Sequence, residues 1–250
     1  MRVHAFIPAR FESTRFPGKP LALIAGRPMI EHVYGRALSC PEVSGVFVAT
    51  DDERIARCVR GFGGKAIRTQ QTHPSGTDRI AEAVETLHLA EEDLIVNIQG
   101  DQPLFEPSVV SDLIKPLKED NRIRMSTLIF RITDEKEVGD PKHVKVVTDK
   151  DGFALFFSRS PIPYFRDSGL KKIHYKHLGF YAYRPAFLRT FASLPVGQLE
   201  WAEKLEQLRA LEHGFKIKAV ETAFDSIEVD TPEDLKRVEN MIQKQSADKA

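Results

Sequence analysis

The sequence predicts an α/β fold with a mostly parallel central sheet and helices on both faces. The first half alternates short apolar runs with amphipathic stretches, in the repeated order strand, helix, strand, helix. This rhythm is typical of βαβ units, whose strands pair in parallel beneath their crossover helices. After about residue 125 the apolar runs follow one another more closely, which predicts a smaller lobe with antiparallel strands.

The expected elements of the first half follow from apolar spacing. Short apolar runs predict strands at residues 3–8, 46–50, 66–69 and 94–98. Apolar side chains at helical spacing predict helices at residues 28–38, 52–62 and 107–117. A further helix carries on one face Ile80, Ala83, Val84 and Leu87. Pro28 suits the first turn of its helix, where a missing amide hydrogen costs no hydrogen bond.

In the second half, apolar runs predict strands at residues 125–133, 144–148, 153–158, 177–183 and 216–221. The turn residues at 149–152 should join the second and third of these strands in a hairpin. One helix is expected to pack through Trp201, Leu205 and Leu208. The last helix begins at a capping box formed by Thr231 and Asp234, and its apolar face includes Val238.

Composition limits the classes of function. Lysine plus arginine and aspartate plus glutamate both total 36, so the formal net charge is zero. A neutral chain gives no support for general binding to nucleic acid or an anionic membrane, and any anion site must be local. The two cysteines, Cys40 and Cys58, have no metal-binding spacing and read as reduced thiols. With no signal-like start and no run of about 20 apolar residues, a soluble cytoplasmic protein is expected.

A cationic loop follows the first strand. Within residues 10–19 lie Arg10, Arg15 and Lys19 together with Ser13 and Gly18. A P-loop is excluded because its first glycine position holds Ser13 and its final position holds proline, and no GxGxxG spacing occurs here. The arginine forks and the mobile lysine charge could instead clamp a triphosphate. A solvated basic loop is the alternative.

Two acids follow strand ends far apart in the sequence. Asp101 ends the segment NIQGD, and Asp230 ends EVD directly before the last helix. In open α/β sheets ligands bind outside the carboxyl ends of the strands, so these carboxylates can converge. Mg²⁺ commonly takes one or two protein carboxylates and completes its shell with phosphate and water, which fits a metal-nucleotide site. Alternatively, Asp230 only starts the helix and Asp101 only shapes a turn.

Ordered sequence blocks resemble a known family along nearly the whole chain, to about residue 242. The blocks are IPARFESTRFPGKPL, VATDDERIA, PSGTDRIAE, NIQGDQP, VKVVTDKDGFALFFSRSPIP, HLGFYAYR, LEQLRAL and VDTPEDL. They resemble 3-deoxy-manno-octulosonate cytidylyltransferases, the CMP-Kdo synthetases of lipopolysaccharide biosynthesis. The resemblance implies a Rossmann-like nucleotide-diphospho-sugar transferase fold, a homodimer and Mg²⁺. It also implies transfer of CMP from CTP to the anomeric hydroxyl of Kdo, with release of diphosphate.

The resemblance divides the chain into parts with different roles. It implies a nucleotide-binding half at residues 1–124, a sugar-binding and dimerisation lobe at 125–225 and a return to the core at 226–245. Residues 246–250 are expected to be a frayed tail. All of residues 1–245 then form a single domain, because no repeat or linker interrupts the sequence.

Site residues carry over from the resemblance by position. Beside the nucleotide it places Arg10, Ser13, Arg15, Lys19, Ser75, Gly76, Arg79 and Gln99. Around the acidic sugar it places Arg159, His177, Tyr183, Glu206 and Gln207. The metal ligands are expected to be Asp101 and Asp230, which together with Lys19 and Arg15 form the catalytic set. An anionic polyol calls for an arginine and for amide or carboxylate groups, which agrees with this list.

Several of these residues also have simpler interpretations. Glu206 could be a solvated helix position, His177 a hydrogen-bonded histidine of the interior, and Tyr183 a core residue. A zinc site at His174 and His177 is rejected, because residues three apart on a strand point to opposite faces. Gln102 stands where relatives often have glutamate, which puts any metal-related role of that position in doubt.

The reaction implied by the resemblance is an in-line displacement at the α-phosphorus without a covalent enzyme intermediate. One Mg²⁺ would be held by Asp101 and Asp230, and a second would accompany the β- and γ-phosphates. Pro74, where a polar residue is usual, leaves the details of nucleotide contact open. Rival functions are a cytidylyltransferase for 8-amino-Kdo or a sialic acid, and a noncatalytic nucleotide-binding protein of the same fold.

Overall fold

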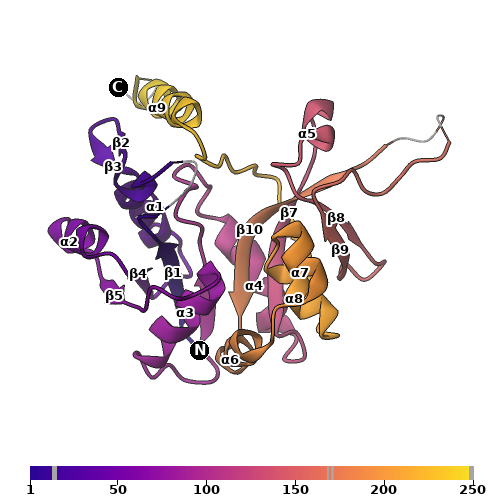
Figure 1. Ribbon diagram of the computed structural model, residues 1–250, viewed down its shortest axis with the longest axis horizontal. Coiled ribbons are helices and arrows are strands. Elements are labelled where there is room, and N and C mark those ends of the chain that lie inside the picture. Colours follow the sequence, from indigo (N-terminus) through magenta and orange to yellow (C-terminus); the bar gives the residue numbers. More distant parts are fainter. Residues whose placement is uncertain (13–15, 168, 170–171, 248–250) are drawn as a thin grey trace.

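The computed structural model describes residues 1–12, 16–167, 169 and 172–247, with side chains described to residue 244 (Figure 1). Its central sheet consists of β1 (Val3–Ala9), β4 (Gly45–Thr50), β5 (Ala66–Arg68), β6 (Leu94–Asn97), β7 (Met125–Arg131), β8 (Lys145–Thr148), β9 (Ala154–Ser158), β10 (Tyr175–Tyr183) and β11 (Lys218–Glu221). A small second sheet pairs β2 (Leu23–Ile24) with β3 (Arg27–Pro28).

The helices are α1 (Met29–Leu38), α2 (Glu53–Gly61), α3 (Gly76–Glu85), α4 (Val109–Glu119), α5 (Glu135–Gly139), α6 (Pro185–Ser193), α7 (Gln198–Glu203), α8 (Gln207–Glu212) and α9 (Pro232–Ala247). A single 3-10 turn, η1, spans Lys19–Leu21. The α/β class is as the sequence predicts, while β2, β3, α5 and α6 are additional elements.

Strand order in the central sheet is β11-β7-β10-β6-β1-β4-β5. The strands β6, β1, β4 and β5 pair in parallel with one another, whereas β10 runs antiparallel to β6 and β7. The hairpin β8–β9 is attached to the edge of β10, as the turn residues at 149–152 predict. The predicted change from parallel to antiparallel pairing is therefore confirmed. The second half nevertheless continues the same sheet, because β7, β10 and β11 belong to it.

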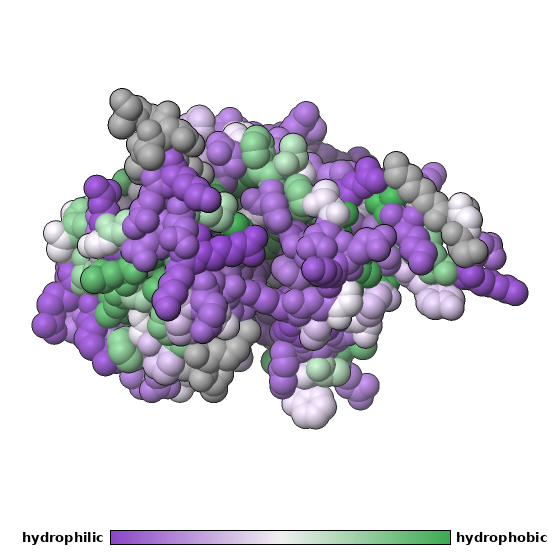
Figure 2. Space-filling model, turned by 90° about the horizontal axis from the view of Figure 1, so that it is seen from above, coloured by the Kyte–Doolittle hydropathy of each residue, from purple (hydrophilic) through white to green (hydrophobic). Residues whose placement is uncertain are grey.

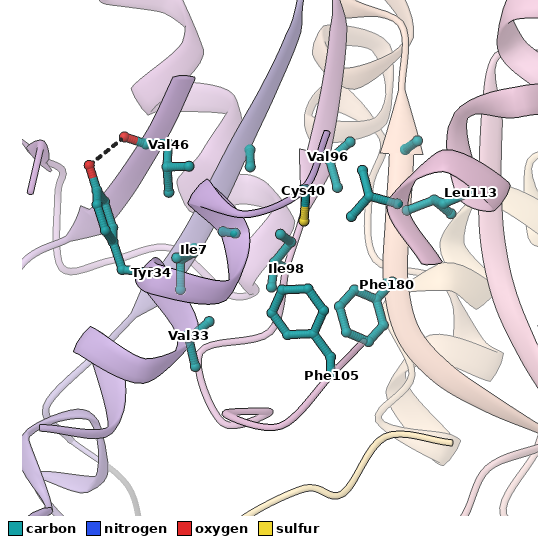
Figure 3. Close-up of a cluster of buried hydrophobic side chains, with 14 of the residues drawn as sticks. Ile7, Val33, Tyr34, Cys40, Val46, Val96, Ile98, Phe105, Leu113 and Phe180 are labelled. Atoms are coloured by element: carbon teal, nitrogen blue, oxygen red, sulfur yellow. Dashed lines mark hydrogen bonds between the residues drawn. The ribbon is translucent and has the colours of Figure 1, made fainter. Parts of the chain in front are cut away.

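Helices cover both faces of the sheet, because alternate side chains of each strand point to opposite sides. In β1, Ala5 and Ile7 join a buried cluster with α1, α2 and α4, while Phe6 joins a second cluster with α3, α6 and α8. Figure 3 shows the first cluster, where Phe105 and Phe180 meet below Ile98. This packing fixes the strand ends that carry the polar residues described below.

The C-terminal segment returns to the N-terminal half of the molecule. After β11 the chain crosses the carboxyl edge of the sheet and leads into α9, which lies beside β2 (Figure 1). The predicted capping box is confirmed, because Thr231 Oγ1 accepts from the amide of Asp234 at 3.2 Å and Asp234 Oδ2 accepts from the amide of Thr231 at 3.0 Å. Helix α9 extends through Ala247, so the tail expected to fray from residue 246 is helical at its start.

One expected helix is broken in two. The stretch with Trp201, Leu205 and Leu208 divides at Lys204, which adopts a left-handed conformation with φ 54° and ends α7. Leu205 and Leu208 are buried as predicted, but Trp201 is 69% exposed and lies against the Lys204 ammonium at 4.9 Å. The packing role predicted for Trp201 is therefore wrong. Among the described residues, no helix is long and apolar enough to cross a membrane.

Candidate functional site

A polar cavity of about 270 Å³ opens at the carboxyl ends of β1 and β6. Parallel pairing of these strands, with Phe6 opposite Asn97, brings the loops that follow them to one edge of the sheet. The walls come from residues 8–10, 19–20, 73–76, 79 and 99–101, together with Asp230. We call this cavity the first pocket. Seen from above in Figure 2, the surface of this side of the molecule is mainly hydrophilic.

Two glycines let the backbone close around the floor of the first pocket. A Cβ atom on Gly100 would lie 2.9 Å from the carbonyl oxygen of Pro8, closer than real Cβ contacts. A Cβ atom on Gly76 would lie 3.2 Å from the ring of the same proline. The absence of side chains at these positions therefore allows β1, the start of α3 and the loop after β6 to meet.

An ion cluster joins three distant segments beside the first pocket. Lys19 Nζ donates to Asp101 Oδ2 at 2.7 Å and to Asp230 Oδ1 at 3.2 Å. Burial alone would lower the pKa of Lys19, but the two carboxylates outweigh it and raise that pKa, so the ammonium remains charged. The convergence of Asp101 and Asp230 expected from their strand ends is therefore observed.

The carboxylates suit a hard divalent cation. Both present oxygen ligands, and Mg²⁺ needs only one or two of them from the protein. A third acid, Glu228, lies near, and burial together with the charges of Asp101 and Asp230 raises its pKa to about 7. Within the described ranges, no group of three or more histidine, cysteine or acidic residues forms a metal-binding cluster. The two carboxylates are the number and type of protein ligand that Mg²⁺ commonly takes.

The other residues expected beside the nucleotide take up different positions. Arg10 is exposed at the wall of the first pocket, and Ser75 caps α3 by accepting from the amide of Asp78 at 3.2 Å. Arg79 lines the pocket but is buried, and its guanidinium contacts Thr69 Oγ1 at 2.6 Å and Asp51 Oδ1 at 3.1 Å. Burial lowers the pKa of Arg79, and the nearby acids oppose that shift.

Residues Ser13 and Arg15 lie outside the described residues. The predicted cationic loop can therefore be assessed only through Arg10, Lys19 and the backbone around Gly18. The amide of Gly18 donates to the carbonyl of Phe11 at 2.8 Å, which draws the two ends of the loop together.

A second cavity of about 440 Å³ adjoins the first. Its walls come from residues 137, 140, 142–144, 159, 176–179, 225–228, 230, 234 and 237, so Asp230 lines both cavities. We call it the second pocket. Gln99 lies on the boundary, where its Nε2 donates to the carbonyl of Gly179 at 2.7 Å. Sequence reasoning missed Lys142, Lys176 and Glu228, because none belongs to a motif with a known spacing.

Arg159 lines the second pocket in a fixed orientation. Its Nε donates to the carbonyl oxygen of Glu203 at 2.8 Å and its Nη1 to that of Pro141 at 2.9 Å. The carboxylate of Glu203 also accepts from the amide of Arg159 at 3.0 Å. The guanidinium is thus held by the end of α7 while its remaining donors can bind an anion in the cavity.

His177 also lines the second pocket and belongs to a hydrogen-bonded chain. Thr127 donates its hydroxyl proton to the carbonyl of Phe180 at 2.6 Å, so it must accept from His177 Nε2 at 2.8 Å. The opposite nitrogen, Nδ1, lies 3.4 Å from Gln207 Nε2. Burial lowers the pKa of His177 to about 3, which leaves the imidazole neutral near pH 7.

The remaining residues expected around the sugar lie behind the two pockets rather than in their walls. Tyr183 is fully buried and shares a hydrogen bond with Thr77 Oγ1 at 3.2 Å. Glu206 accepts from the same hydroxyl at 2.7 Å, and burial raises its pKa. Gln207 is buried and accepts from the hydroxyl of Tyr181 at 3.0 Å. These side chains join the start of α8 to α3 and β10.

The structure shows the neighbours of Gln102 and Pro74, the two residues that depart from the family pattern. Gln102 is fully buried, donates to the carbonyl of Leu178 at 2.7 Å and accepts from Ser226 Oγ at 2.9 Å. Its amide lies 3.4 Å from Glu228, where a second carboxylate would add repulsion. Pro74 lies in the wall of the first pocket beside Ser75.

The chain is similar in sequence to known cytidylyltransferases. The family model described as Cytidylyltransferase matches residues 4–219. A 3-deoxy-manno-octulosonate cytidylyltransferase of Syntrophus aciditrophicus is 55% identical, over 96% of this chain and 97% of that protein. An 8-amino-3,8-dideoxy-manno-octulosonate cytidylyltransferase of Shewanella piezotolerans is also 55% identical, over 94% and 96% of the two chains.

Solved structures show the same architecture. A structure of CMP:2-keto-3-deoxy-manno-octonic acid synthetase complexed with CTP matches with a TM-score of 0.91 and 42% identity, over 98% of this chain and 100% of that chain. A cytidylyltransferase from Leptospira borgpetersenii matches with a TM-score of 0.63 and 18% identity, over 98% and 87% of the two chains. The second likeness shows a shared fold, and the first confirms the fold class expected from the sequence.

The neutral state of His177 has a measurable consequence for stability. Between about pH 6.5 and 3 the unfolded chain protonates this imidazole while the folded protein does not. The free energy of unfolding should therefore fall as the pH is lowered through this range, by up to about 1.4 kcal/mol per pH unit from this group. Urea unfolding of His177→Gln at several pH values should give a shallower dependence than the unsubstituted protein. Identical slopes for the two proteins would contradict the buried neutral state.

Proposed function

Because the chain belongs to the cytidylyltransferase family, we propose that it transfers CMP from CTP to the anomeric hydroxyl of 3-deoxy-D-manno-octulosonate (Kdo), with release of diphosphate. The observation that carries this proposal is that Asp230 lines both pockets. A carboxylate shared by two adjoining cavities marks the place where two substrates can meet. Its partners Lys19 and Asp101 put a cation and a second acid at the same place.

The first pocket has the chemistry that a triphosphate needs. Arg10 offers an exposed fork of donors and Lys19 a charged ammonium, and both line the same cavity as Ser75 and Gly76 at the start of α3. We place the nucleotide here, with its phosphates directed toward Lys19. In an in-line displacement at the α-phosphorus, positioning and neutralisation of charge lower the barrier, and Lys19 would stabilise the departing diphosphate.

We further propose that Asp101 and Asp230 bind Mg²⁺. When bound, the metal would neutralise phosphate charge at the junction of the two pockets. The support from this chain is the paired oxygen donors and the raised pKa of Glu228, which burial raises most and the charges of Asp101 and Asp230 raise further. Lys19 contacts both carboxylates, and the amide of Val229 donates to the main-chain carbonyl of Asp101 at 2.9 Å, which ties the segment before Asp230 to the loop after β6.

The second pocket suits an acidic sugar. Arg159 can meet a carboxylate, and His177, as a neutral group, can exchange hydrogen bonds with hydroxyls. Lys176 is buried between Glu137 and Asp225, at 2.7 and 2.8 Å, and so adds an ordered polar wall. A polyol with one carboxylate matches this mixture of charge and hydrogen-bonding groups.

Two further properties are proposed, the number of subunits and the location in the cell. We infer a homodimer, because two large hydrophobic side chains are exposed: Leu155 on β9 and Tyr164 in the segment that follows it. Sedimentation equilibrium measures the number of subunits. We also infer a cytoplasmic location, supported by Cys40 and Cys58, which are both free thiols. Fractionation of cells that produce the protein tests the location.

A panel of sugars tests the proposed reaction. The purified protein, with CTP and Mg²⁺, should release diphosphate with Kdo. The second candidate substrate is 8-amino-Kdo, since a relative that bears its name is equally similar in sequence. A sialic acid serves as the third member of the panel. Faster turnover with 8-amino-Kdo would change the assigned substrate, and no diphosphate with any sugar would reject the enzymatic function.

Replacement of Lys19 tests its assignment to the leaving group. Lys19→Ala should lower kcat/KM by about 100-fold or more, because loss of one preorganised donor costs on the order of 3 kcal/mol in a transition state. Lys115→Ala is a matched control, since that lysine lies exposed on α4. Circular dichroism establishes that both variants are folded. Wild-type turnover by Lys19→Ala would remove this residue from the mechanism.

Replacement of Asp101 tests the metal site. Asp101→Asn should abolish turnover across a Mg²⁺ titration and should weaken the Mg²⁺ binding measured by calorimetry in the presence of CTP, because one anionic ligand is lost. Asp151→Asn, in the exposed turn between β8 and β9, controls for the change of net charge. Unchanged Mg²⁺ affinity in Asp101→Asn would exclude Asp101 as a ligand.

A further inference from the structure

A buried ion cluster lies next to the first pocket but outside its walls. Arg209 on α8 is only 1% exposed and binds two carboxylates through both edges of its guanidinium. Its Nη1 and Nη2 donate to the carboxylate of Asp78 at 2.9 and 3.2 Å. Its Nε and Nη2 donate to the carboxylate of Glu200 at 2.7 Å each. The proposed reaction assigns no role to any of these three side chains.

One arm of this cluster reaches the nucleotide side. Asp78 lies in the first turn of α3, and its Oδ2 accepts from the hydroxyl of Ser75 at 2.7 Å. Ser75 and the following Gly76 form part of the wall of the first pocket. A continuous path of hydrogen bonds therefore runs from the guanidinium of Arg209 through Asp78 to a residue that faces the cavity. The other arm, to Glu200, ends on α7.

The cost of burying these ions indicates that the cluster fixes the orientation of its members rather than adding stability to the fold. Taking an arginine and two carboxylates out of water costs several kcal/mol for each ion, and their mutual attraction often does no more than repay it. An apolar side chain could fill the same volume without that cost. What a guanidinium adds is a planar fork that fixes a carboxylate in direction as well as in distance. The carboxylate that is fixed in this way, Asp78, is the one that accepts from the hydroxyl of Ser75, a residue of the pocket wall.

We propose that Arg209 is a positioning residue for the nucleotide: through Asp78 it orients the first turn of α3, and with it Ser75, toward the bound triphosphate. The inference rests on the proposed function for the identity of the ligand, CTP. Arg209 lies on α8, outside the walls of the first pocket, and acts on that pocket through Asp78. The arm to Glu200 completes the coordination of Arg209 but does not touch α3.

The two arms provide a matched pair of substitutions. Asp78→Asn and Glu200→Gln each remove one negative charge from the same buried arginine, but only Asp78→Asn loosens α3. The dissociation constant for CTP, measured by calorimetry without sugar, should rise about tenfold in Asp78→Asn, the worth of one charge-assisted hydrogen bond. In Glu200→Gln it should stay within about twofold of the unsubstituted value. Thermal unfolding of both variants measures any general loss of stability.

A double-mutant cycle separates positioning from stability. If Asp78 acts through Ser75, Ser75→Ala should weaken CTP binding and the double variant should lose little more than Asp78→Asn alone. Should Asp78→Asn fail to fold, Arg209→Lys takes its place in the same cycle, because it keeps the charge and loses the fork. Equal weakening by Asp78→Asn and Glu200→Gln, strictly additive losses, or unchanged CTP affinity in Asp78→Asn would each overturn the proposal.

The same experiment distinguishes failure of the inference from failure of the proposed function. An unsubstituted protein that binds CTP but releases no diphosphate with any sugar would remove the reaction, while the order of the CTP affinities would still decide the role of Arg209. An unsubstituted protein that binds no CTP would overturn both.

Discussion

The site depends on one partly buried ammonium that holds two carboxylates from segments far apart in the chain. Lys19 follows the first strand, Asp101 follows β6, and Asp230 precedes the last helix, so their contacts tie the three segments at the carboxyl edge of the sheet. Two carboxylates would repel one another without a cation between them. The return of the C-terminal segment to the N-terminal half, and with it the wall between the two pockets, therefore relies on this charge balance.

One ammonium does not balance two carboxylates, and the remaining negative charge affects the group next to them. Glu228 lies close enough to Asp101 and Asp230 for their charges, added to burial, to raise its pKa to about 7. Burial is the larger cause of this shift, and the two carboxylates add to it, so a further negative charge is disfavoured here. Phosphate groups can approach these carboxylates more easily when a cation neutralises part of the charge. The proposal of Mg²⁺ at this junction therefore agrees with the electrostatics as well as with the type of ligand.

The sequence predicted the fold and the convergence of Asp101 with Asp230 for one physical reason: both depend on local rules. Apolar periodicity marks strands, and in parallel sheets their carboxyl ends share an edge, so Asp101 and Asp230 could be expected to converge. The sugar side was less predictable, because burial there depends on a helix break at Lys204 that no motif signals. That break exposes Trp201 and lets α8 begin afresh beside α3.

The break at Lys204 also explains why residues carried over for the sugar lie behind the cavities. In a single continuous helix, the side chain of Glu206 would point about 100° around the helix axis from that of Leu205. Instead α7 ends at Lys204 and α8 begins at Gln207, and Glu206 accepts from both the amide and the hydroxyl of Thr77, at the start of α3. Glu203, at the end of α7, accepts from the amide of Arg159 and holds its guanidinium through the carbonyl oxygen. The segment of α7 and α8 therefore contacts a helix that borders the first pocket and an arginine that lines the second, so it links the two proposed substrate sites.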